Sequence, residues 1–120
     1  MQTAEIGIKC QGTILLIKVQ DVLSVVAEGN HAIVQFESGS SRLREPLSAI
    51  AKKLEPYGLI RIHRSALVNR SWIEAVSSMG AGKYVVRLKG GREFAVTSAY
   101  RENLKLLADV WIGNEAFLSR

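Results

Sequence analysis

Apolar residues in this chain recur mostly at every second position, within short segments that glycine, asparagine and serine separate. Such alternation is typical of β-strands with one buried face, and the intervening residues favour turns because glycine and asparagine tolerate positive φ. We predict strands over residues 13–19, 21–27, 32–37, 59–67, 72–76, 84–88 and 93–96. Breaks between strands are predicted at residues 28–31, 38–41, 68–71, 77–82 and 89–92. The second and third strands form a hairpin, and so do the last two, where two adjacent glycines mark the turn.

Two short segments have the pattern of a helix instead. Leu47, Ile50 and Leu54 recur at intervals of three and four residues, so they share one face of a helix that begins near Pro46. We expect this face to belong to the core. A second short helix is predicted after Ser98, because serine often caps a first turn. The predicted fold class is therefore mainly β with one or two short helices, and strands do not alternate with long helices as in a doubly wound sheet.

Length and composition favour a single domain over residues 1–120. A chain of 120 residues with 48% hydrophobic content can bury one core. No apolar run approaches the ~18–20 residues of a membrane span, and the N-terminus lacks a secretory pattern. Cys10 is the single cysteine, so no intramolecular disulfide or cysteine-based zinc site can form. We expect a soluble, cytoplasmic protein.

The distribution of charge points to a polyanionic partner. The net charge is +5 and the pI is near 9.7. Residues 61–101 hold eight basic and two acidic residues, a net charge of +6, whereas the remainder holds eight basic and nine acidic residues, a net charge of −1. A basic segment on a neutral remainder favours nucleic acid, and the alternative is a solvated surface that binds nothing specific.

Three predicted loop regions carry side chains that could contact nucleic acid. They are residues 30–31, residues 63–64 with 69–70, and residues 98–101. Arginine can bind a guanine edge or a phosphate through two hydrogen bonds, and asparagine or histidine can bind a base edge. Three of these assignments have an ordinary alternative: Asn30 as a turn former, Asn69 as a backbone cap and Arg61 as a solvated strand charge.

Catalysis and metal binding have little support in the sequence. His31 and His63 are the only histidines, and a metal site would need both together with a carboxylate. Ser65 follows His63 without a nearby acid to complete a catalytic relay. Residues 80–83 lack the spacing of a phosphate-binding loop. We therefore predict no enzyme activity, cofactor, metal or small-molecule substrate; an enzyme would need a pocket that joins a histidine to a carboxylate.

The segment Arg61-Ile62-His63-Arg64-Ser65-Ala66-Leu67-Val68-Asn69 resembles the signature of the LytTR-type DNA-binding domain, the output domain of bacterial response regulators. Other segments that resemble the family in the same order are residues 27–31, 47–54, 72–76 and 88–98. The resemblance covers about residues 10–108 and leaves residues 109–120 as a C-terminal extension. That extension holds Trp111, Ile112, Phe117 and Leu118, so we expect it to pack on the domain or on a second copy.

The resemblance implies a fold and a function. The implied fold is an elongated β-β-β sandwich of antiparallel sheets with a short helix. The implied function is sequence-specific binding of double-stranded DNA by a transcriptional regulator, with loops that read successive major grooves from one side. Repeated half-sites, a homodimer on DNA and an upstream receiver or sensory domain outside this chain are also implied. That sensory half could attach the regulator to a membrane.

The resemblance assigns DNA-binding roles to Asn30, His31, Arg61, His63, Arg64, Asn69, Arg70, Ser98, Tyr100 and Arg101. Base contacts fall on residues 30–31, on Arg64 and on residues 98–101, and the others shape the loop or contact phosphates. Ala99 departs from the family, where a basic residue is common, so Tyr100 or Arg101 takes over that contact. Together with Ala66 and the apolar tail, this departure motivates an alternative function, a β-rich protein-interaction module that has lost DNA binding.

Overall fold

A computed structural model describes residues 4–113 of the chain. The strands are β1 (Glu5–Cys10), β2 (Thr13–Lys18), β3 (Val22–Glu28), β4 (His31–Phe36), β5 (Gly39–Leu43), β6 (Leu59–His63), β7 (Ala66–Asn69), β8 (Ile73–Ser78), β9 (Tyr84–Leu88) and β10 (Glu93–Val96). The helical segments are α1 (Leu47–Leu54), the short 3₁₀ turns η1 (Val19–Asp21), η2 (Glu55–Tyr57) and η3 (Arg70–Trp72), and the longer 3₁₀ segment η4 (Ser98–Leu107). No helix in this part of the chain is long and apolar enough to span a bilayer.

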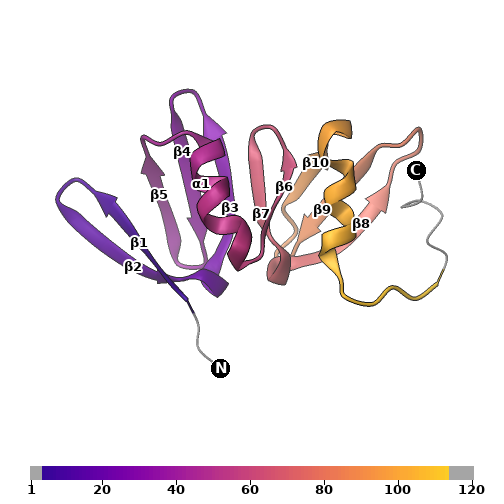
Figure 1. The fold of residues 1–120 in the computed structure, drawn as a ribbon, viewed down its shortest axis with the longest axis horizontal. Coiled ribbons are helices and arrows are strands. Elements are labelled where there is room, and N and C mark those ends of the chain that lie inside the picture. The colour runs from indigo at the N-terminus through magenta and orange to yellow at the C-terminus, as the bar shows by residue number, and fades with distance from the viewer. Residues whose placement is uncertain (1–3, 114–120) are drawn as a thin grey trace.

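Three antiparallel sheets lie in a row along the long axis of the molecule (Figure 1). The central sheet has five strands in the order β5-β4-β3-β7-β6. The hairpin β1-β2 lies at one end of the row, and the sheet β10-β9-β8 lies at the other. The molecule is elongated, with principal extents of 49 × 36 × 25 Å. This architecture confirms the mainly β class, the antiparallel sheets and the two short helices.

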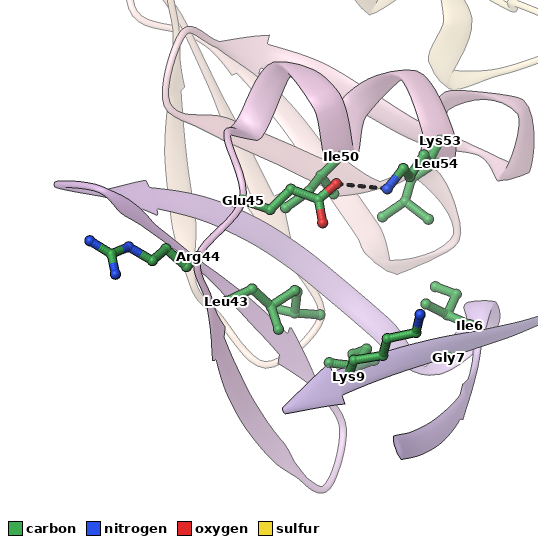
Figure 2. Close-up of a pocket in the computed structure, with 11 residues that line it drawn as sticks. Ile6, Gly7, Lys9, Leu43, Arg44, Glu45, Ile50, Lys53 and Leu54 are labelled. Atoms are coloured by element: carbon green, nitrogen blue, oxygen red, sulfur yellow. Dashed lines mark hydrogen bonds and ion pairs between the residues drawn. The ribbon is translucent and has the colours of Figure 1, made fainter. Parts of the chain in front are cut away.

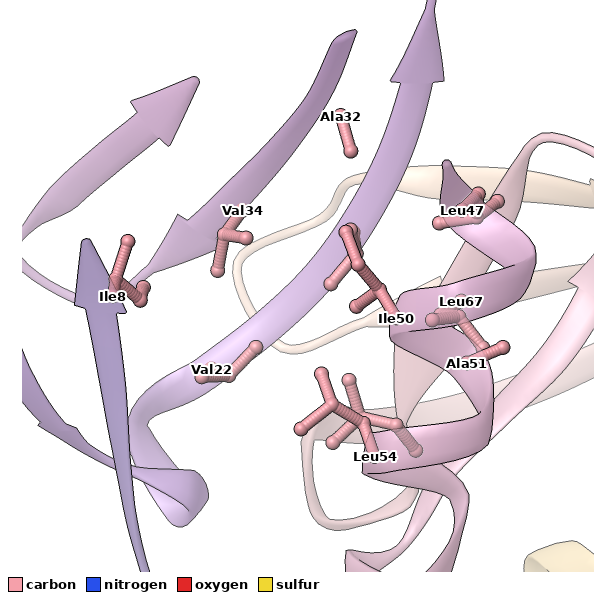
Figure 3. Packing of buried hydrophobic residues seen from close by; sticks show 11 residues of the cluster. Ile8, Val22, Ala32, Val34, Leu47, Ile50, Ala51, Leu54 and Leu67 are labelled. Carbon is pink, nitrogen blue, oxygen red and sulfur yellow. The ribbon is translucent and has the colours of Figure 1, made fainter. Parts of the chain in front are cut away.

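The first core cluster lies between α1 and the central sheet. Leu47, Ile50 and Leu54 are each less than 8% exposed, which confirms the predicted apolar face of the helix. Figure 3 shows these side chains facing those of the strands, with Ile8 and Val34 on the side of β1 and β4. Each fully buried side chain of this size contributes about 1.5–3 kcal/mol. The helix therefore fixes the central sheet from which the loops project.

The second core cluster joins β6 and β7 to β8–β10 and η4. Its largest buried side chains include Ile62, Leu88 and Leu104. Trp111 packs against this cluster, so the expectation that the tail contacts the domain is confirmed for Trp111. Ile112, in contrast, is 94% exposed. The other two apolar tail residues, Phe117 and Leu118, lie outside the described residues.

Two strands at the N-terminal end of the row were not predicted. β1 pairs with β2 through a tight turn at Gln11-Gly12, whose φ values are 48° and 81°. β5 pairs with β4 where we had expected a turn over residues 38–41. The turn is at residues 37–38 instead. Gly39, Ser40 and Ser41 have low strand propensity, so their pairing with β4 overrides their local preference.

The predicted strand over residues 59–67 is wrong in one respect, because it is a hairpin. β6 ends at His63, the chain turns at Arg64-Ser65, and β7 returns antiparallel to β6. Neither residue is a glycine or proline, so the turn had no strong local signal. Val68 and Asn69 still belong to β7, so the predicted break there begins too early. The predicted hairpins between β3 and β4 and between β9 and β10 are confirmed.

Candidate nucleic-acid interface

The first two candidate loops lie next to each other because β3 and β7 are paired. Their register aligns Val26 with Ala66, and the N–H of Ala27 donates to the carbonyl of Ser65 at 2.9 Å. The turn that follows β3 contains Asn30, and the turn that precedes β7 contains Arg64. Both turns therefore lie at the same edge of the central sheet, which is the top edge in Figure 1.

The third candidate loop reaches the same edge through η4. The N–H of Thr97 donates to the carbonyl of Ile62 at 3.0 Å, and the side-chain amide of Asn103 donates to the carbonyl of Arg61 at 2.8 Å. These two bonds show that η4 runs alongside β6 in the opposite direction. Ser98, at the start of η4, therefore lies beside the end of β6. We call the two turns and the first half of η4 the loop edge.

Arg61 connects two parts of the loop edge. Its Nε donates to the carbonyl of His63 at 3.0 Å, and its Nη2 donates to the carbonyl of Arg64. The guanidinium carbon also lies 5.3 Å from the ring centroid of Tyr100 in η4, within the range of a cation–π contact. Arg61 is therefore not a free strand charge. It holds the carbonyls of the β6–β7 turn and links that turn to η4.

The β6–β7 turn exposes one arginine and uses a histidine to hold its shape. The Nδ1 atom of His63 accepts a hydrogen bond from the N–H of Ser65 at 3.0 Å, which leaves the other ring nitrogen for a partner. Arg64 is exposed at the tip of the turn. Asn30 is exposed in the neighbouring turn, and His31 is half-buried at the start of β4. In η4, Ser98 is exposed and Arg101 is half-buried.

Asn69 does not lie on the loop edge. The residue is 3% exposed at the far end of β7. Its amide donates to the carbonyls of Val19 and Val22 at 3.0 and 2.8 Å, and its oxygen accepts from the N–H and hydroxyl of Ser71, both at 3.0 Å. Both amide hydrogens and both lone pairs of the side-chain oxygen are thus used within the protein. Asn69 has the backbone-capping role that the sequence left open as the alternative.

Arg70 is also separated from the loop edge. It follows Asn69, so the length of β7, about 13 Å for four residues, lies between it and the β6–β7 turn. Its Nη2 atom forms an ion pair with Oδ2 of Asp109 at 3.1 Å. A phosphate that approached the loop edge would therefore not meet Arg70. The sequence placed it near Arg64 only because the hairpin between them was not recognised.

The basic segment of residues 61–101 is divided between opposite edges of the molecule. Arg64 and Arg101 lie on the loop edge. Lys89 lies at the other end of β9, where its N–H donates to the carbonyl of Trp72 and its Nζ donates to the carbonyl of Ser71 at 3.2 Å. Arg92 is in the same β9–β10 turn and covers a phenylalanine ring. The net charge of +6 counted over residues 61–101 is therefore larger than the charge that a single partner at the loop edge would meet.

Strand β5 brings Arg44 to the loop edge, a basic residue that the sequence analysis did not select. Leu43, its last residue, is paired with Ala32 in β4, so Arg44 continues beyond β4 towards the first turn. Arg44 is exposed. The preceding Arg42 forms an ion pair of 3.6 Å with Glu28, which partly neutralises it. Only knowledge that β5 is a strand paired with β4 could have revealed Arg44.

A cavity of about 510 Å³ lies beside α1, and Arg44 is among the residues that line it. It is formed between β1, β5 and α1, and its walls include Ile6, Leu43 and Leu54. Figure 2 shows the ion pair of Glu45 and Lys53, 2.8 Å long, on its rim. Neither histidine lines this cavity. Within residues 4–113, no group of three or more His, Cys, Asp and Glu side chains could hold a metal ion.

Comparison with known proteins identifies the family. The family model of the LytTr DNA-binding domain matches residues 12–109. The chain is 28% identical over 98 residues to the sensory transduction protein LytT of Bacillus subtilis, a match that covers 82% of this chain and 41% of that protein. It is 26% identical over 90 residues to the transcriptional regulatory protein LytR of Staphylococcus aureus, a match that covers 75% of this chain and 37% of that protein.

A solved structure has the same fold. It is described as the LytTr DNA-binding domain of a "putative methyl-accepting/DNA response regulator" from Bacillus cereus, with a TM-score of 0.74 and 19% sequence identity, covering 89% of this chain and 97% of that one. The match to the family model over residues 12–109 shows that the chain belongs to the LytTr DNA-binding domain family, which supports a role in DNA binding for transcription regulation. The chain spans about two fifths of the length of the curated relatives.

Proposed function

We propose that this chain binds double-stranded DNA sequence-specifically through the loop edge, as the output domain of a bacterial transcriptional regulator. The observation that carries the proposal is the convergence of three loops, far apart in the sequence, on one edge. The pairing of β3 with β7 and the bond from Thr97 to Ile62 bring them together. The loops project from strands that two core clusters hold in place, as a rigid reading surface requires.

The spacing of the loops suits a duplex that lies along the molecule. Neighbouring strands lie about 4.8 Å apart, so the first two turns, which are centred two strands apart, are separated by about 10 Å. This is close to the major-groove width of about 12 Å. The first half of η4, which lies beside the end of β6, continues this row of loops along the long axis of the molecule. We propose that the loops read successive major grooves from one face.

We propose three base-reading positions on this edge. Arg64 projects from the tip of its turn and can bind a guanine edge through two hydrogen bonds. Asn30 with His31 reads from the first turn. Arg101, with the exposed Ser98, reads from η4, because Ala99 cannot make a polar side-chain contact.

Arg61 and Tyr100 have a positioning role in this proposal. Arg61 fixes the carbonyls of the turn that carries Arg64, and its contact with Tyr100 fixes the start of η4 relative to that turn. His63 shapes the same turn through its bond to Ser65. These residues determine where the base-reading side chains lie, and they differ in this respect from Arg64 itself.

The proposal is tested by comparing two single variants on DNA. Duplexes recovered from a random pool are titrated with the unaltered chain, Arg64→Ala and Lys89→Ala, at several salt concentrations. Arg64→Ala should lose about 1–3 kcal/mol on the preferred duplex and discriminate less at one base pair. Lys89→Ala removes the same charge from the opposite edge and should bind nearly as tightly as the unaltered chain. Equal losses for both variants would reduce the loop edge to a generally basic surface.

The assembly on DNA is a further part of the proposal. We propose that two copies occupy repeated half-sites, that a receiver or sensory domain lies outside this chain, and that the regulator acts in the cytoplasm. The name of one relative, a sensory transduction protein, supports the sensory domain. The paired half-sites and the cytoplasmic location rest on the sequence analysis. Mass measurement of the complex on a duplex with one or two half-sites tests it: one copy on either duplex would contradict paired binding.

One feature favours the alternative of a protein-interaction module. The outer face of the β1–β2 hairpin exposes Ile14 by 61% and Leu16 by 69%. Exposed neighbouring apolar side chains often mark a surface that contacts another protein. A salt-insensitive complex with a protein, combined with no binding to any DNA in the pool, would favour this alternative over DNA binding.

A further inference from the structure

The β8–β9 loop, residues 79–83, lies on the same edge as the three reading loops. β8 ends where Ser78 is paired with Tyr84, and Tyr84 is in turn paired with Val96 at the end of β10. The chain leaves β10 directly into η4, so the loop flanks the start of η4. In Figure 1 it is the last loop of the upper edge, beyond η4 at the end of the row. Nothing in the resemblance assigned it a role.

Gly82 of this loop lies against a proposed base-reading side chain. A Cβ atom at Gly82 would come within 2.7 Å of Nη1 of Arg101. The guanidinium therefore rests on the backbone of the loop, in space that any larger residue would take. The φ value of Gly82 is +73°, which also favours glycine. The loop thus supports Arg101 from the outer side.

The tip of the loop, residues 80–82, presents backbone rather than large side chains, whereas Met79 and Lys83 are exposed at its two ends. Gly80, Ala81 and Gly82 all have positive φ, and the largest side chain among the three is a methyl group. Two backbone bonds hold the loop closed, from Met79 to Lys83 at 2.7 Å and from Lys83 to Gly80 at 3.0 Å. A surface of this kind can approach another backbone closely. Residues 80–82, at the tip of the loop, offer no side chain that could read a base edge.

Lys83 supplies a charge at the base of the loop. The residue is exposed, and none of the ion pairs among residues 4–113 includes it. Lys89, at the other end of β9, instead donates its Nζ to the carbonyl of Ser71. An exposed ammonium group is suited to a phosphate, which it binds as a point charge.

We propose that the β8–β9 loop is a fourth DNA-contacting segment, which binds the sugar–phosphate backbone at the outer end of the site. Lys83 neutralises a phosphate there, and Gly82 holds Arg101 towards the groove. The inference rests on the proposed function, since it assumes that the loop edge faces DNA. It extends the contact surface beyond η4 and predicts that DNA flanking the specific bases contributes to affinity without contributing to specificity.

Proximity can be measured with a cleavage reagent attached to the loop. Cys10→Ser removes the only cysteine, and Ala81→Cys then provides one attachment site for an iron chelate that cleaves nearby DNA. Lys89→Cys, in the same background, places the reagent on the opposite edge as a control. The duplex is one selected by the unaltered chain. We expect focused cleavage at one end of the site from position 81 and only weak, scattered cleavage from position 89.

The charge contribution is measured from the salt dependence of binding. Each phosphate contact contributes about 0.9 to the slope of log affinity against log salt. Lys83→Ala should reduce the magnitude of this slope by about one while keeping the order of preference among duplexes, whereas Lys89→Ala should leave the slope unchanged. Unfolding midpoints of all variants are compared first, so that a folding defect is not taken for a lost contact.

The outcomes separate the two proposals. If the unaltered chain selects no sequence from the pool, the proposed function fails. If it selects a sequence but position 81 cleaves no more than position 89, the fourth contact alone is overturned. An unchanged salt slope in Lys83→Ala would likewise overturn the role of Lys83 while leaving the reading loops in place.

Discussion

Replacing Asn69 by alanine removes a side chain that fastens three segments of the fold together. The amide joins β7 to the carbonyls of Val19 and Val22, and the oxygen holds the N–H of Ser71 in η3. Asn69 is 3% exposed and Val22 is fully buried. Water therefore cannot readily replace the bond to Val22 in the variant. The perturbation falls on the junction between the central sheet and the sheet β10-β9-β8.

The expected loss of stability is a sum of two effects. A buried carbonyl left without a donor costs about 1–3 kcal/mol, which applies to Val22. Loss of an asparagine cap costs about 0.5–2 kcal/mol, which applies to the first turn of η3. Val19 is half-buried and Ser71 is exposed, so water compensates for most of their lost bonds. We expect Asn69→Ala to lower the free energy of unfolding by about 1.5–5 kcal/mol.

Urea unfolding followed by tryptophan fluorescence measures this change. Asn30→Ala is the matched control, because it removes the same amide from an exposed turn and should change stability by less than about 0.5 kcal/mol. Asn69→Asp is a second probe of the geometry. It keeps the acceptor for Ser71 but turns a carboxylate oxygen towards two carbonyls, so it should destabilise at least as much as alanine at neutral pH.

DNA binding should respond in the opposite way to these two asparagine changes. At a temperature where both variants are fully folded, Asn69→Ala should retain most of its affinity, whereas Asn30→Ala should lose some. A stability loss below about 0.5 kcal/mol for Asn69→Ala, with a large loss of affinity, would refute our reasoning. That result would place Asn69 among the DNA contacts after all.

Three further predictions concern the positioning residue, the core and the outer loop. Arg61→Ala should weaken specific binding at least tenfold, as measured by fluorescence anisotropy, because the β6–β7 turn and η4 lose their link. Arg61→Lys should restore little of this affinity, since one ammonium group cannot reproduce the several N–H donors of a guanidinium. Ile50→Ala should lower the free energy of unfolding by about 2–5 kcal/mol, whereas the exposed Ser48→Ala should have almost no effect in the same urea titration. Gly82→Ala should displace the guanidinium of Arg101 and weaken DNA binding. Its free energy of unfolding should fall only by the backbone strain of about 1–2 kcal/mol. Unchanged affinity would show that Arg101 does not depend on the loop.

Local patterns in the sequence were enough to predict several elements of the fold. The apolar spacing of Leu47, Ile50 and Leu54 gave α1, and the pair of glycines at residues 90–91 gave the β9–β10 hairpin. Both signals act within a few residues, where spacing and turn preference are decisive. β5 was missed because its Gly39-Ser40-Ser41 start looks like a turn. Its strand conformation depends on pairing with β4, which local preference does not encode.

The candidate site was predicted in part for the same reason. Individual residues such as Arg64 and Asn30 could be chosen by their chemistry and by the family resemblance. Their proximity depends on the pairing of β3 with β7, whose residues are about forty positions apart in the sequence. The β6–β7 hairpin was not recognised, so Asn69 and Arg70 were grouped with Arg64 although β7 separates them. The contact of Gly82 with Arg101 also joins two distant segments and left no signal in the sequence.

The central claim, that the loop edge reads a specific DNA sequence, is tested most directly by selection from a random pool. The unaltered chain is mixed with random duplexes at near-physiological salt, and bound duplexes are amplified and sequenced. We predict enrichment of a short motif, repeated about one helical turn apart, together with binding that weakens steeply as salt rises. If no sequence were enriched and the binding were weak and disappeared at higher salt, the claim would be contradicted. The loop edge would then be a basic surface that does not read a sequence.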